Sequence, residues 1–318
     1  PRVRADLIRL LELRRPLIQV RSARRDNLAY AMRRRPEEPL PEVLAALEQA
    51  RGAVLIYART RRSVEAWARR LSEAGVEAIA YHAGMDPESR ALALAHFQEH
   101  PAPVLVATVA FGMGVDRPDV GLVLHLDLPS SAEGYLQESG RAGRDGLPAE
   151  CLVLFRPGDR TSLARAIRAG VREAGDDPEE QQRGELAQQQ LRRMEAVAEG
   201  SGCREQALLL AVGELVPPCG RCDRCLARPA LVDWSQQAAA VLALLEQRSG
   251  LDVRSLGEEL AQADGDLGGD EGDRWRWLAR RLVQEDLLSE SDDGSQRLWL
   301  KPAGRRFLQQ PWSLKLAA

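Results

Sequence analysis

The stretch GAVLIYARTRRSVEAWARRLSEAGVEAIAY, residues 52–81, decides the fold class because two apolar segments of strand length flank one helical segment. The first segment, 52–58, is continuously apolar, whereas the pattern from Ser63 to Ala74 is helical and ends before Gly75. A strand that is apolar throughout, followed by a helix and a second strand, is typical of a parallel sheet. The stretch therefore predicts one β-α-β unit of an α/β domain.

The same alternation of strand and helix continues on both sides of this stretch, as far as about residue 160. Asp86 and Pro87 suit the N-cap and the first turn of a helix that runs to about His100. Further strands are predicted at 16–20, 76–84, 104–109, 121–129 and 150–155. We therefore expect an α/β lobe whose loops ARTRR, YHAG, TVAFGMGVD and QESGRAGRDG lie at the carboxyl ends of its strands.

The composition fits a globular protein of two or three domains, with 318 residues, 44% hydrophobic content and a net charge of −3. Basic residues exceed acidic ones in 1–175 and the reverse holds afterwards, so nucleic-acid binding would depend on local charge. The lack of a long apolar run or a leader predicts a cytoplasmic protein. The start at Pro1 and the KLAA at 315–318, which looks like a cloning-vector scar, indicate a fragment.

The second half of the chain reads as helices followed by a hairpin. Helices are predicted at 179–197, 234–247, 253–263 and 274–285. Two alternating segments then follow, joined by Asp293-Gly294, which is a good hairpin turn. This order suits a winged helix. The expected domains are an α/β lobe, a helical metal-binding module and a winged helix, with the boundaries 1–160, 161–231 and 232–314.

Four of the five cysteines lie in a pattern that predicts a metal site. They are Cys203, Cys219, Cys222 and Cys225, and the last three form CGRCDRC, two overlapping C-x2-C steps. In a cytoplasmic chain this spacing favours zinc over disulfides, because tetrahedral zinc takes four thiolates and a two-residue gap lets one turn present two of them. The fifth, Cys151, opens an apolar strand and is interpreted as a buried core residue.

The segment QESGRAGRDG, residues 137–146, holds two arginines three residues apart among glycines. Arg141 and Arg144 could reach a polyphosphate, or they could be surface salt-bridge residues. The sequence contains no G-x-x-x-x-G-K-[ST], so a phosphate cradle would have to lie outside these residues.

Together, YARTRRSVE, AYHAGM, VLVATVAFGMGVDRPDV, YLQESGRAGRDGLPAE and CGRCDRC resemble the carboxyl half of a RecQ-family DNA helicase, over about residues 4–310. The resemblance implies a second RecA-like lobe, a helical zinc-binding module and a winged helix. It implies ATP-dependent 3′-to-5′ DNA unwinding in repair and recombination, by a monomer near the bacterial nucleoid whose partners are single-stranded and forked DNA. The first lobe, with its Walker motifs, would supply the ATP and Mg²⁺ site, so the fragment alone is expected to be inactive.

The resemblance also assigns roles to individual residues. The catalytic residues implied are Arg144, Arg141 and Gln137, and the nucleotide contacts are Asp116, Arg141 and Arg144. The DNA contacts implied are Thr60, Arg61, His82, Gly84 and Thr108 in the lobe, and Arg276 and Arg280 in the winged helix. The structural Zn²⁺ ligands implied are Cys203, Cys219, Cys222 and Cys225. Asn27 and Tyr30 match the lobe junction, where this chain has Arg25-Asp26 in place of the family's usual Arg-Pro.

Other interpretations stay open. His82 could be a structural histidine, and Asp116 could be a capping carboxylate. The whole chain could be a non-catalytic DNA-binding or protein-binding module built on a helicase lobe. An RNA-helicase lobe is less favoured, because neither the cysteine module nor FGMG belongs to that class.

Overall fold

The computed structural model describes residues 2–19, 21–109, 111, 116–175, 177–227, 230–263, 271–291 and 295–317. Two features expected from the sequence lie outside these ranges. They are residues 112–114 of the FGMG motif, which spans 111–114, and the Asp293-Gly294 turn.

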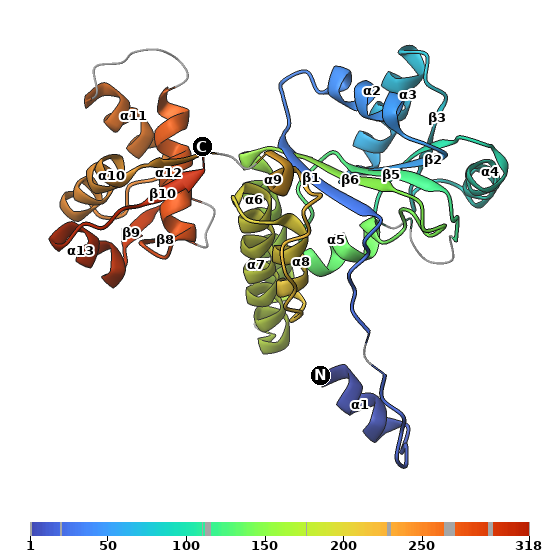
Figure 1. Cartoon of the computed structure of the whole chain (residues 1–318), viewed down its shortest axis with the longest axis horizontal. Coiled ribbons are helices and arrows are strands. Elements are labelled where there is room, and N and C mark those ends of the chain that lie inside the picture. The colour runs from blue at the N-terminus through green and yellow to red at the C-terminus, as the bar shows by residue number, and fades with distance from the viewer. Residues whose placement is uncertain are drawn as a thin grey trace.

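A six-stranded parallel sheet forms the centre of the first half of the chain (Figure 1). Its strands are β1 (Leu28–Arg34), β2 (Ala53–Tyr57), β3 (Ala78–Tyr81), β4 (Val104–Ala107), β5 (Val120–His125) and β6 (Ala149–Phe155). They lie in the order β1-β6-β5-β2-β4-β3, and every neighbouring pair is parallel. The expected α/β lobe is confirmed.

The strand predicted at 16–20 is wrong. Residues 16–19 belong to no strand, and the side chains of Leu17 and Ile18 are exposed. The edge strand is instead β1, which pairs with β6 from Leu28 to Arg34. This strand is mostly buried from Leu28 to Met32 and ends in two exposed arginines, Arg33 and Arg34. α1 (Arg2–Leu10) lies apart from the sheet (Figure 1).

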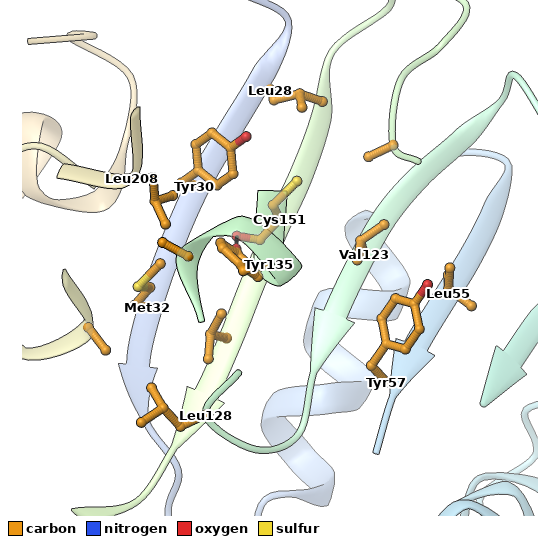
Figure 2. Packing of buried hydrophobic residues seen from close by; sticks show 14 of the residues in the cluster. Leu28, Tyr30, Met32, Leu55, Tyr57, Val123, Leu128, Tyr135, Cys151 and Leu208 are labelled. Atoms are coloured by element: carbon orange, nitrogen blue, oxygen red, sulfur yellow. Dashed lines mark hydrogen bonds between the residues drawn. The ribbon is translucent and has the colours of Figure 1, made fainter. Parts of the chain in front are cut away.

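Helices cover both faces of the sheet. The helices of the lobe are α2 (Leu40–Gln49), α3 (Arg61–Glu73), α4 (Pro87–Glu99) and α5 (Ala132–Ser139). α2 and α3 bury Val43 and Val64 on one face, whereas α4 and α5 bury Phe97 and Tyr135 on the other. Figure 2 shows Tyr135 packed against the sheet on this second face. The helix expected after Asp86 is confirmed, and the Asp86 side chain accepts a hydrogen bond from the N–H of Ser89.

The helical module shares its hydrophobic core with the lobe. Its helices are α6 (Pro157–Glu173), α7 (Pro178–Glu199), α8 (Arg204–Ala211) and α9 (Asp223–Ala227). Leu191, Met194 and Leu208 belong to the same buried cluster as the residues of β1 and α5, and Figure 2 shows Leu208 beside Tyr30. The module therefore packs on the face that α5 also covers.

The last part of the chain has a hydrophobic core of its own. Its elements are β7 (Leu231–Asp233), α10 (Ser235–Gln247), α11 (Val253–Ala263), α12 (Glu271–Gln284), β8 (Leu288–Glu290), β9 (Leu298–Leu300), α13 (Pro302–Gln309) and β10 (Lys315–Ala317). Three helices followed by the antiparallel pair β8-β9 give the order expected for a winged helix. Residues 315–317, which lie beyond the expected domain boundary at 314, pair with β7, and Leu316 is buried.

No helix in the described ranges combines the length and the apolar character that crossing a membrane requires.

Candidate functional site

The arginine loop, residues 140–148, lies at the amino edge of the sheet and not at the carboxyl edge as predicted. The N–H of Gly143 donates to the carbonyl of Val120, where β5 begins, at 2.8 Å. The N–H of Asp145 donates to the carbonyl of Pro118 at 3.0 Å. The physical reason is that α5 follows the carboxyl end of β5 and runs back along the sheet, so the segment after it returns to the opposite edge.

The loop is held in place by three side chains from outside it. Asn27 Nδ2 donates to the carbonyls of Gly143 and Leu147 at 2.7 and 2.9 Å, and Arg25 Nη2 donates to the Gly143 carbonyl at 2.5 Å. Arg51 forms a two-pronged ion pair with Asp145 at 2.8 and 2.9 Å. Hydrogen bonding to Arg51 lowers the pKa of Asp145 below its ordinary value. The loop is thus fixed before any ligand binds.

The two arginines of the loop point to different surroundings. Arg144 forms an ion pair with Asp116, and both residues are exposed, so this pair is accessible to an anionic ligand. Arg141 lies against Tyr57. Burial raises the pKa of Tyr57, and the Arg141 guanidinium reduces this rise without reversing it. Gln137 is exposed on α5. The structure therefore brings Arg144 and Asp116 together and places Arg141 deeper in the lobe.

The predicted DNA contacts of the lobe lie together at the carboxyl edge of three adjacent strands. Thr60 follows β2, Thr108 follows β4, and His82 and Gly84 follow β3. Thr60 caps α3, because its Oγ1 accepts a hydrogen bond from the N–H of Ser63 at 3.1 Å. The capping oxygen keeps its own proton, which it can donate to a phosphate.

Arg61 and His82 are held in place at this edge. Arg61 lies so close to Gly84 that a Cβ on that glycine would come within 2.8 Å of Arg61 Nη1. His82 is buried, and its Nε2 lies 3.1 Å from a carboxylate oxygen of Glu65. Burial with a carboxylate partner favours the structural interpretation of His82, and its contact with DNA stays a prediction.

A cavity of 150 Å³ lies where β2 and β5 end. Its lining includes Arg59, His125, Asp127 and residues of α5. His125 Nε2 lies 2.7 Å from Glu138 Oε2, and its ring stacks on Tyr57 with ring centres 4.9 Å apart. No sequence pattern indicates this cavity, because its lining comes from four separate segments, 57–59, 109, 125–138 and 163.

The arginines predicted to contact DNA from the winged helix are engaged by carboxylates. Arg276 Nη2 lies 3.9 Å from Glu258 Oε1 on α11. Arg280 lies one turn further along α12, where its charge acts on Glu195 of α7. Both arginines are half-buried, and their contact with DNA stays a prediction.

A buried ion-pair network joins the helical module to the winged helix. Arg160 of α6 pairs with Glu195 Oε2 at 3.0 Å and with Glu290 of β8, and all three side chains are at most 13% exposed. Burial raises the pKa of Glu195 to about 8, with Arg160 opposing and Glu199 adding to the rise.

The four cysteines predicted as metal ligands converge on one point. Their Sγ atoms all lie within 4.8 Å of one another, with Cys203 to Cys222 at 3.9 Å and Cys219 to Cys225 at 4.0 Å. Tetrahedral zinc with Zn–S bonds of about 2.3 Å requires S···S separations of ~3.8 Å. The donor set and its spacing therefore fit a closed zinc site.

Backbone N–H groups surround the sulfur atoms. Cys203 Sγ accepts from the N–H of Cys219 at 3.2 Å, and Cys219 Sγ accepts from the N–H of Cys222 at 3.3 Å. Hydrogen bonds of this kind stabilise thiolate charge, which suits sulfur atoms bound to a cation.

The metal module also covers the free edge of the sheet. Asp223, between two of the cysteines, accepts a hydrogen bond from the N–H of Met32 in β1 at 3.1 Å. Arg204, with no exposed side-chain surface, pairs with Asp223 at 2.9 Å and donates to the Gly200 carbonyl at 3.0 Å. An edge strand otherwise presents unpaired backbone groups that invite association. The sequence carried no signal for Arg204, because its role depends on contacts across the fold.

Two families of protein match this chain. The helicase conserved C-terminal domain matches residues 37–146, and the RecQ zinc-binding family matches residues 157–226. The second match contains all four cysteines of the metal site.

Individual relatives are similar over more of the chain. ATP-dependent DNA helicase RecQ of Haemophilus influenzae is 37% identical over 243 residues, which cover 76% of this chain and 38% of that protein. RecQ of Pasteurella multocida is 36% identical, covering 78% and 39%. ATP-dependent DNA helicase Q-like 2 of Arabidopsis thaliana is 30% identical, covering 91% and 41%. The chain thus spans about two fifths of the length of these relatives.

Proposed function

The chain carries the C-terminal domain of a RecQ-family helicase joined to a RecQ zinc-binding module, and from this we propose that it serves an ATP-dependent 3′-to-5′ DNA helicase of repair and recombination. In this proposal it is the second lobe, and a first lobe with the Walker motifs supplies the phosphate cradle for ATP and Mg²⁺. The chain by itself would then not hydrolyse ATP.

The observation that carries the proposal is the arginine loop. Arg144 is exposed at the amino edge of the sheet, on a loop fixed by Asn27, Arg25 and Arg51. A guanidinium held in this way can neutralise the charge that develops on a transferred phosphoryl group. We assign Arg144 as the arginine finger and Arg141 as its partner toward the phosphates or the other lobe, with Gln137 and Asp116 beside them.

The opposite edge of the sheet would carry the DNA. Thr60, Arg61 and Thr108 follow adjacent strands and offer hydroxyl, guanidinium and backbone N–H groups, which suit contacts with a phosphate backbone regardless of sequence. Nucleotide and DNA would therefore bind at opposite ends of the same strands. Closure of the lobes on ATP and reopening after hydrolysis would then move the contacts with single-stranded DNA along the strand.

The zinc site has a structural role in this proposal. Four thiolates leave a tetrahedral ion no open position for water or substrate, so the ion supplies folding energy and no step of the reaction. The residues that would hold it are Cys203, Cys219, Cys222 and Cys225.

The proposal is tested by strand separation with the full-length protein that contains these residues. DNA duplexes with a single-stranded tail on the 3′ or the 5′ side are compared, with and without ATP. We expect ATP-dependent unwinding of the 3′-tailed duplex and loss of unwinding in Arg144→Ala. Tight binding of both duplexes without unwinding of either would contradict the proposal and would identify a binding module.

A further inference from the structure

The position of the arginine loop depends on a short segment in front of β1. Gly143 lies between the two arginines with φ at +55°, and its carbonyl accepts hydrogen bonds from both Arg25 and Asn27. The carbonyl of Asn27 in turn accepts from the N–H of Ala149, where β6 begins, at 2.9 Å. Residues 25–27 thus bind the loop at its middle and at its end.

Arg221 of the zinc module holds the same segment from the other side. Its Nε donates to the carbonyl of Leu28 and its Nη2 to the carbonyl of Arg25, each at 2.9 Å. Its Nη1 lies 3.3 Å from Asp26 Oδ1. Asp26 also pairs with Arg24 at 2.8 Å. One guanidinium therefore fixes both ends of the segment that binds the arginine loop.

The cysteine site fixes the position of Arg221. It lies between Cys219 and Cys222, and its own N–H donates to Cys219 Sγ at 3.5 Å. Four sulfur atoms within 4.8 Å of one another need a cation to hold them there as thiolates. The backbone that carries Arg221 is therefore ordered by the same ion that orders the cysteines.

From this chain of contacts we propose that Arg221 is a positioning residue for the arginine loop, and that it links the zinc site to Arg141 and Arg144 through residues 25–28 and Gly143. The proposal rests on the proposed function only for its effect on turnover. The contacts that join Arg221 to residues 25–28 and to Gly143 lie within this chain, and they do not depend on that function. Asp26 belongs to it, because its carboxylate supplies a partner for Arg221.

The sequence of the zinc module offers a matched control. Arg224 takes the same place in the second C-x2-C step that Arg221 takes in the first. The charged groups that act on the pKa of Arg224 are Arg204, Asp223, Arg281 and Cys222, and none of them belongs to residues 25–28. Arg221→Ala and Arg224→Ala therefore remove the same side chain from equivalent positions, and only the first breaks the link.

Hydrogen exchange of the chain, measured on a peptide that covers residues 140–149, tests the link together with the zinc content. We expect Arg221→Ala to keep one zinc per chain and to exchange roughly tenfold faster in this peptide, because the loop loses part of its support. Arg224→Ala should exchange as the parent does. Unchanged exchange in zinc-loaded Arg221→Ala, or equal acceleration in Arg224→Ala, would overturn the proposal.

Arg221→Lys keeps the experiment decisive if Arg221→Ala loses zinc. Lysine retains the charge but cannot reach both carbonyls at once, so we expect bound zinc and intermediate exchange. Loss of zinc in both variants would make Arg221 a folding residue of the zinc module and would overturn the positioning role.

Turnover in the full-length protein gives a second readout. Arg221→Ala should lower kcat for ATP with little change in KM, because a misplaced finger weakens contacts made in the transition state. If Arg144→Ala leaves turnover unchanged, the proposed function fails. The hydrogen-exchange result still shows whether Arg221 positions the arginine loop.

Discussion

Replacing Arg160 with glutamine should destabilise the junction between the helical module and the winged helix. Arg160 is the shared partner of Glu195 and Glu290, and its side chain is only 8% exposed. Its removal leaves two buried carboxylates without this counter-charge. Breaking a buried pair in this way costs ~3–5 kcal/mol. We therefore expect Arg160→Gln to lower the free energy of unfolding of the winged helix by that amount at alkaline pH.

The cost should depend on pH in a direction that Glu195 sets. Burial raises its pKa to about 8 from an ordinary 4.5, so between these values the folded protein binds one proton more than the unfolded chain. The free energy of unfolding then falls as pH rises through this window, by up to ~5 kcal/mol. At about pH 6 Glu195 is neutral and needs Arg160 less, so Arg160→Gln should cost less there than at about pH 9.

Urea unfolding followed by tryptophan fluorescence at these two pH values measures both effects, because five of the six tryptophans lie beyond residue 233. Glu195→Gln is the companion variant, and it should flatten the pH dependence, because an amide does not titrate. If Arg160→Gln lowers the free energy of unfolding by less than ~1 kcal/mol at the higher pH, or by the same amount at both pH values, the predicted role of the Arg160 ion pairs is contradicted.

Three further outcomes follow from single contacts. Cys222→Ser should lose zinc and unfold residues 203–225, seen as loss of bound metal and of helical circular dichroism, since a structural zinc site supplies ~10 kcal/mol or more. Gly143→Ala should lower stability by ~1–3 kcal/mol in thermal unfolding, because φ is +55° and the new Cβ would lie 2.5 Å from Asn27 Nδ2. Thr60→Ala should cost ~1 kcal/mol in urea unfolding, and Thr60→Ser, which keeps the cap of α3, should cost little.

The sequence predicted those parts of the fold that depend on local pattern. Strands such as β2 and β5 are buried on both faces, so they read as continuous apolar runs. The cap at Asp86 and the spacing of the cysteines are also local, and the structure confirms both. The edge strand β1 was missed, because part of its packing comes from α8 and α9, far along the chain.

The sequence named candidate residues but misplaced the arginine loop. The loop lies at the amino edge of the sheet, because a segment that follows a helix returns to the start of the next strand. The ion pair between Arg144 and Asp116 and the effect of Arg280 on Glu195 join segments that are far apart in the sequence, and the sequence pattern predicted neither. Contacts between distant segments determine such positions, and the hydrophobic periodicity of one segment cannot predict these contacts.

The measurement that tests the account most directly is DNA-stimulated ATP turnover of the full-length protein and of its Arg144→Ala variant. Arg172→Ala, at an exposed position on α6, is the control for loss of a surface arginine. We expect Arg144→Ala to lower kcat by ~10³-fold or more and Arg172→Ala to leave it near the parent value. Equal turnover in Arg144→Ala and the parent would contradict the claim that this loop completes a nucleotide site on another lobe.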